Sequence, residues 1–121
     1  MTAHSTASSP CITGWNHSQF GKLDGIDPEA LIGQVAKAAI EHAGLTPEDI
    51  GSIHIGTFNG GFLYQDFPSS LVFNTLPELR FTPAVRVENA CATGSAAIHS
   101  GMQSILSGQA KHALVIGFEK M

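Results

Sequence analysis

Apolar residues recur at helical spacing in the segment that follows Asp27-Pro28-Glu29. Asp27 suits the cap of a helix, Pro28 its first position, and Glu29 the positive end of the helix dipole. Gly44 suits a left-handed residue just beyond the last turn. The pattern between these signals predicts an amphipathic helix, whose apolar stripe is Leu31, Ile32, Val35, Ala36, Ala39, Ile40 and Ala43.

Short apolar segments predict four strands. Cys11–Trp15 and Ser52–Gly56 are the first two, and 84–88 alternates apolar and polar residues, which indicates a strand with one less buried face. The segment 112–118 contains the unbroken apolar run Ala113–Ile116. Such a run is typical of a central parallel strand that is covered on both faces.

The segments between these strands predict helices and turns. Thr46-Pro47-Glu48-Asp49 indicates a single capped turn, and Asn59-Gly60-Gly61 a loop. Helices are expected from about Pro68 to Leu76 and from about Cys91 to Ser107. Alternating strands and helices predict an α/β fold, with a mostly parallel sheet and helices on both faces.

Composition narrows the class of protein. The chain has 121 residues, 43% hydrophobic and 13% charged, with a net charge of −4 and six scattered Lys and Arg residues. These numbers fit one domain and argue against nucleic acid as a partner. No run of about 18 apolar residues is present, so no membrane-spanning helix is expected.

The ends and the cysteines give further expectations. Residues 1–9 lack the basic and apolar parts of a signal peptide, so a disordered leader is expected before a domain over 10–121. Cys11 and Cys91 are far apart and form no metal-type pair, which favours a reduced, cytoplasmic setting. Cys11, in a predicted strand, is expected to be a core residue.

Cys91 is the candidate catalytic residue. It follows the predicted strand 84–88 and begins the next predicted helix. In open α/β sheets ligands bind at the carboxyl ends of the strands. The partial positive charge and free N–H groups of a helix N-terminus favour thiolate over thiol and can hold an oxyanion. The alternative is that Cys91 is a small buried hydrophobe, as free cysteines commonly are.

The helix after Cys91 is rich in small residues, and it also carries the bulky stripe Ile98, Met102, Ile105 and Leu106. Glycine within a helix is unfavourable, so Gly94 and Gly101 predict close approach of another element and a buried helix. The six histidines have no metal-ligand spacing. His99 points away from the helix start, so packing or hydrogen bonding is its expected role.

The segments 87–97 and 114–121 resemble the N-terminal half of thiolases, closest to the sterol-carrier-protein type and acetyl-CoA acetyltransferase-like members. Gly21–Asp24 and Gly56–Gly60 fit the same pattern, and the resemblance spans 10–121. It implies an α/β fold of two similar halves in five layers. It also implies that an acyl-CoA or 3-ketoacyl-CoA acylates Cys91, with the Cys91 N–H in the oxyanion hole. Homo-oligomers are implied, with coenzyme A thioesters as substrates and no metal or redox cofactor.

The sequence departs from the family in three features. It lacks the family's Gly-His-Pro motif, its second catalytic cysteine and its water-positioning loop. The chain is therefore expected to be part of such an enzyme, inactive until a complementing C-terminal part is supplied. Two alternatives remain open. One is a fragment of a ketoacyl synthase-type condensing enzyme, and the other is a non-catalytic thiolase-like assembly module.

Overall fold

The computed structural model describes residues 9–61, 64 and 66–121. Apart from residue 9, the expected leader lies outside the described residues. Three strands, β1 (Ser52–Gly56), β2 (Ala84–Val87) and β3 (Ala113–Gly117), form one parallel sheet in the order β2-β1-β3. Its α-helices are α1 (Pro28–His42), α2 (Val72–Thr75) and α3 (Thr93–Leu106). Within the described residues, no helix is both long and apolar enough to span a bilayer.

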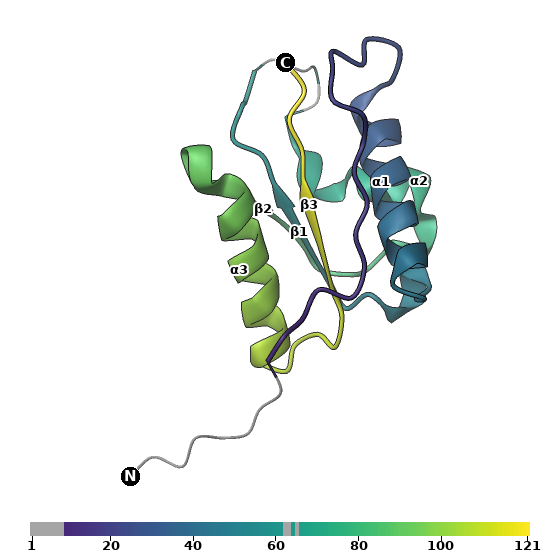
Figure 1. The fold of residues 1–121 in the computed structure, drawn as a ribbon, viewed down its shortest axis with the longest axis vertical. Coiled ribbons are helices and arrows are strands. Elements are labelled where there is room, and N and C mark those ends of the chain that lie inside the picture. Colours follow the sequence, from purple (N-terminus) through teal and green to yellow (C-terminus); the bar gives the residue numbers. More distant parts are fainter. Residues whose placement is uncertain (1–8, 62–63, 65) are drawn as a thin grey trace.

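The helices lie on both faces of the sheet. Figure 1 shows α3 on one side and α1 with α2 on the other. In the register, Ile53 of β1 pairs with Ala84 of β2 and with Leu114 of β3. The α/β class predicted from the alternation of elements is confirmed.

Local signals explain where α1 begins and ends. The Asp27 Oδ1 atom accepts a hydrogen bond of 2.7 Å from the N–H of Ala30, and Gly44 has the left-handed φ of +70°. In the following turn the Thr46 N–H donates to the Asp49 carboxylate at 2.8 Å. Both predictions are confirmed.

The helix predicted from Pro68 to Leu76 is divided in two. A 3-10 turn over Pro68–Ser70 precedes α2, and a second 3-10 turn begins at Pro77. Because proline favours the first position of such turns and disfavours helix in the preceding residue, Pro68 and Pro77 set the two ends of the segment.

The apolar core lies between the sheet and the layer formed by α1 and α2. Its largest fully buried side chains are Ile32, Val72, Leu79, Ile53 and Ile55. On the opposite face of β1 the side chains are polar or absent, since Ser52, His54 and Gly56 alternate with the isoleucines. That face is covered by α3.

The segment 112–118 has an apolar run typical of a central strand, but in the described sheet it is an edge strand. Strand β3, which lies within this segment, is beside β1 at one side of the sheet. The central strand is β1, and all five of its residues are buried. Leu114 and Ile116 are buried in the core, whereas Ala113 and Val115 are half-buried. An unbroken apolar run indicates that both faces of a strand have apolar contacts. It does not determine where the strand lies in the order of the sheet.

The predicted strand at Cys11–Trp15 is wrong. These residues form an extended segment outside the sheet, and Cys11 is exposed. The Trp15 N–H donates to His42 Nδ1 at 3.1 Å. A Cβ atom on Gly14 would lie 2.6 Å from the Ala43 nitrogen. The segment therefore packs against the C-terminal end of α1 and does not join the sheet.

Candidate active site

Cys91 lies in the connection between β2 and α3. It is the middle residue of a 3-10 turn, Ala90–Ala92, and its side chain is exposed. The α-helix itself begins two residues later than the sequence predicted, at Thr93. The prediction that places the thiol at the carboxyl end of a strand and the start of a helix is confirmed.

Hydrogen bonds hold this turn from both sides. The Thr93 Oγ1 atom accepts from the Asn89 N–H at 2.9 Å and donates to the Ala90 carbonyl at 2.6 Å. A Glu88 carboxylate oxygen accepts from the Ala90 N–H at 2.6 Å. Ala90 has a φ of +44°, a left-handed conformation that costs a non-glycine residue about 1–2 kcal/mol. The surrounding hydrogen bonds offset this cost.

The backbone N–H of Cys91 is not used in holding the turn. Among the turn and cap hydrogen bonds of the described residues, none has this group as its donor. The group lies at the N-terminal end of the 14-residue helix α3, where the aligned peptide dipoles give a partial positive charge. The arrangement can therefore stabilise negative charge on an atom beside the thiol.

The carboxyl ends of the three parallel strands meet at this edge of the sheet. The loop after β1 is tied there by two side chains. A Glu119 carboxylate oxygen accepts from the Phe58 N–H at 2.7 Å, and Arg86 Nε donates to the Thr57 carbonyl at 3.2 Å. A Cβ atom on Gly56 would lie 3.1 Å from Thr93 Cγ2, so the end of β1 packs directly on the start of α3.

The helix α3 rests on the sheet through its small residues. A Cβ atom on Gly101 would lie only 2.7 Å from Val115 Cγ2, which confirms the predicted close approach at that glycine. A Cβ atom on Gly94 would meet nothing within 4 Å, so the same prediction is wrong there. The expected burial of the whole helix is also wrong. Ile98 and Leu106 are 46% and 50% exposed, because the sheet covers one face of α3.

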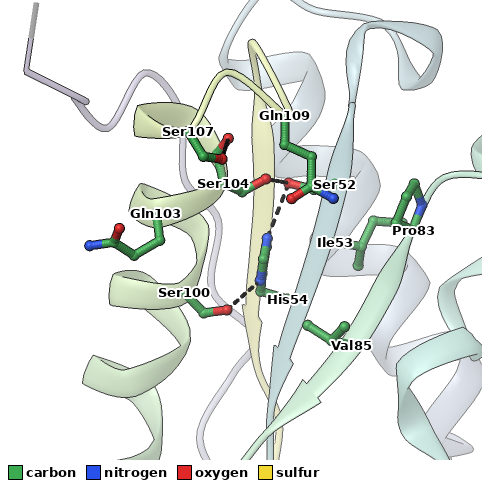
Figure 2. A pocket seen from close by; sticks show the side chains of 10 residues that line it. All are labelled: Ser52, Ile53, His54, Pro83, Val85, Ser100, Gln103, Ser104, Ser107 and Gln109. Carbon is green, nitrogen blue, oxygen red and sulfur yellow. Dashed lines mark hydrogen bonds between the residues drawn. The ribbon is translucent and has the colours of Figure 1, made fainter. Parts of the chain in front are cut away.

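A groove of about 400 Å³ lies between α3 and strands β1 and β2. Figure 2 shows its lining and a chain of hydrogen bonds along one wall. His54 Nδ1 lies 2.7 Å from Ser100 Oγ, and His54 Nε2 lies 3.1 Å from Ser52 Oγ. The Ser104 hydroxyl donates to Ser52 Oγ at 2.9 Å. Burial of the imidazole lowers the pKa of His54.

Sequence reasoning missed this polar cluster. The available signal was the alternation of Ser52 and His54 with two isoleucines, which places both polar side chains on one face of a buried strand. Cys91 is not among the residues that line the groove. A second, smaller cavity of about 240 Å³ near Lys120 does not include it either.

The other sequence candidates lie apart from this edge. His99 is exposed on α3, and Cys11 is exposed in the extended N-terminal segment. No group of three or more His, Cys, Asp or Glu side chains within the described parts of the chain could hold a metal ion.

Comparison with known proteins places this arrangement in a family. Residues 11–121 match the model of the thiolase N-terminal domain. The chain is 32% identical over 111 residues to an acetyl-CoA acetyltransferase of Methanothermobacter thermautotrophicus, with 91% of this chain and 29% of the relative covered. It is 34% identical over 111 residues to that of Methanocaldococcus jannaschii, with 91% and 28% covered.

A solved structure, the 3-oxoacyl-[acyl-carrier-protein] synthase III of Aquifex aeolicus, has a TM-score of 0.68 and 29% identity. The similarity covers 78% of this chain and 30% of that one. The chain belongs to the thiolase N-terminal domain family. It spans less than a third of the length of the acetyl-CoA acetyltransferases that it matches.

Proposed function

We propose that Cys91 is the acyl-accepting nucleophile of a thiolase-type acyltransferase that acts on acyl-CoA or 3-ketoacyl-CoA thioesters. The observation that carries the proposal is the exposed thiol on the turn between β2 and α3, next to a backbone N–H that the turn leaves free. Membership of the thiolase N-terminal domain family and similarity to acetyl-CoA acetyltransferases support the same chemistry.

In the first step the Cys91 thiolate attacks the thioester carbonyl carbon. The carbonyl oxygen becomes an oxyanion, which accepts a hydrogen bond from the Cys91 N–H. The carbon–sulfur bond to coenzyme A then breaks, its sulfur leaves as a thiolate, and the acyl group remains as a thioester on Cys91. This step requires a nucleophile and N–H donors, so neither a metal nor a redox cofactor takes part in it.

The second step returns the acyl group to a thiolate or transfers it to a carbon nucleophile. Transfer to carbon requires a base that removes a proton from the attacking acyl unit. We propose that this base comes from a complementing C-terminal part, and that the complete enzyme is a homo-oligomer in the cytoplasm, where cysteines stay reduced. The chain alone then acylates Cys91 slowly and does not make or break carbon–carbon bonds.

A second candidate is the condensing step of a ketoacyl synthase, favoured by the fold similarity to the Aquifex aeolicus synthase. It shares the acylation of Cys91 and differs in the second step. Thiolase-type activity is preferred, because the family match and both acetyl-CoA acetyltransferase relatives cover more of this chain.

The test is acetylation of the chain by a small thioester, S-phenyl thioacetate, read by peptide mass spectrometry. Cys11 is an internal control, because it is also exposed but lies in no helix or turn of this kind. Acetylation of Cys91 should be about tenfold faster than that of Cys11, and Cys91→Ser should abolish the fast phase. Equal rates at the two cysteines would contradict the proposal and favour a non-catalytic assembly module.

A further inference from the structure

The peptide group between Ala90 and Cys91 is held in one orientation by Thr93. The Ala90 carbonyl accepts two hydrogen bonds from this residue, one from its hydroxyl at 2.6 Å and one from its backbone N–H. A trans peptide is planar, and its C=O and N–H point in opposite directions. No cis peptide bond occurs among the described residues. With the Ala90 oxygen turned toward Thr93, the Cys91 N–H points away from it.

We infer that Thr93 is a positioning residue, whose hydroxyl aims the Cys91 N–H at the oxyanion that forms during acylation. The inference rests on the proposed function of Cys91. It adds a role for a side chain that does not itself touch the acyl group.

The Thr93 side chain is well suited to fix a direction. It is 6% exposed, and its methyl group packs against Gly56 at the end of β1. As a β-branched residue it has few side-chain rotamers within a helix. Its hydroxyl also accepts a hydrogen bond from the Asn89 N–H at 2.9 Å. The hydroxyl thus donates its proton to the Ala90 carbonyl and accepts a proton from the Asn89 N–H. These two bonds fix the rotation of the hydroxyl.

The peptide group before Ala90 is fixed from the other side. The Glu88 carboxylate accepts from the Ala90 N–H at 2.6 Å. Ala90 is thereby kept at its positive φ with its carbonyl directed toward the helix. Loss of the Thr93 hydroxyl removes one of the two donors to that carbonyl and the acceptor of the Asn89 N–H, which frees the peptide group to rotate.

Two reactions of Cys91 separate this role from a general role in folding. Iodoacetamide alkylates a thiolate at a saturated carbon, and no oxyanion forms. S-phenyl thioacetate acylates it through an oxyanion. A residue that aims the N–H group affects the second rate and leaves the first close to that of the wild-type chain.

The experiment compares both rates in Thr93→Val, Thr93→Ser and the wild-type chain. Thr75→Val is the matched control, because the Thr75 hydroxyl also donates to a backbone carbonyl, at 3.3 Å, but in α2 on the opposite face of the sheet. Thr93→Val should slow acylation of Cys91 by about tenfold or more, while its alkylation rate is retained. Thr93→Ser and Thr75→Val should keep both rates.

Three results would overturn the inference. They are equal acylation rates in Thr93→Val and wild type, an equal loss of alkylation and acylation in Thr93→Val, and a loss in Thr93→Ser as large as in Thr93→Val. The last result would assign the effect to the methyl contact with Gly56. These results leave the proposed function standing whenever wild-type Cys91 is acylated faster than Cys11. If the wild-type chain shows no such preference, the proposed function fails and the inference fails with it.

Discussion

The His54 imidazole joins the central strand to helix α3, since its Nδ1 atom lies 2.7 Å from the Ser100 hydroxyl oxygen. His54 is 7% exposed, and the second nitrogen of its ring lies 3.1 Å from Ser52 Oγ. Burial disfavours the charged imidazolium and lowers the pKa of His54 below the ordinary value of 6.5. The helix that begins beside Cys91 is thus attached to the sheet through a group that titrates.

Stability should therefore depend on pH below 6.5. Between the folded-state pKa of His54 and 6.5, the unfolded chain binds more protons than the folded chain. The free energy of unfolding should rise with pH across this window and level off above it. Urea denaturation between pH 5 and 7.5 measures this slope. His54→Gln should reduce it, whereas His99→Gln, on the exposed side of α3, should not. An unchanged slope in His54→Gln would refute the assignment.

Two glycines of α3 should respond to alanine in opposite ways. A Cβ atom at position 101 would lie 2.7 Å from Val115 Cγ2, so Gly101→Ala should destabilise the chain by about 1–3 kcal/mol. At position 94 nothing lies within 4 Å, so Gly94→Ala should stabilise the helix by about 0.5–1 kcal/mol. Chemical denaturation of both variants tests the pair. The same sign of effect at both positions would contradict the packing described for α3.

Removal of the cap of α1 should cost about 1 kcal/mol. Asp27→Ala leaves the Ala30 N–H without its 2.7 Å partner, whereas Asp27→Asn keeps an oxygen acceptor there. Thermal unfolding should show a lower midpoint for the alanine variant and a smaller change for the asparagine variant. Asp24→Ala, at an exposed residue before the helix, is the control. Equal effects of Asp24→Ala and Asp27→Ala would show that the cap does not matter.

Lys120 ties the end of the described chain to the loop before α1. Its ammonium group donates to the Leu23 carbonyl at 2.6 Å and also to the Ile26 carbonyl. Because these bonds have a charged donor, Lys120→Met should cost about 1.5 kcal/mol in urea denaturation. Lys37→Met, at an exposed position of α1, should have little effect. The contact would be unimportant if the two variants unfold at the same urea concentration.

The elements with strong local signals were predictable from the sequence. The Asp27 cap and Gly44 bound α1, and the alternation in 84–88 indicated β2. The helix expected from about Cys91 to Ser107 agrees with α3 to within two residues at each end. The position of Cys91 between β2 and α3 followed from the order of these elements along the chain. These features depend on interactions over a few residues, which a sequence pattern records directly.

What failed depends on contacts between distant residues. Nothing in the run Ala113–Ile116 tells whether β3 or β1 is central, since both are apolar on the core face. The segment Cys11–Trp15 has the composition of a strand, but it lies against the end of α1 through Gly14 and Trp15. His54 is hydrogen-bonded to Ser100, 46 positions further along the chain, and Ser52 to Ser104, 52 positions further. No local sequence pattern encodes these pairings.

The central strand β1 contributes alternate residues to two different layers, with isoleucines in the apolar core and Ser52 and His54 beneath α3. Because both helical layers depend on the same five residues, neither layer can come apart and leave the other intact. The chain should therefore melt in a single cooperative transition, and the amides of β1 should be the last to exchange with deuterium.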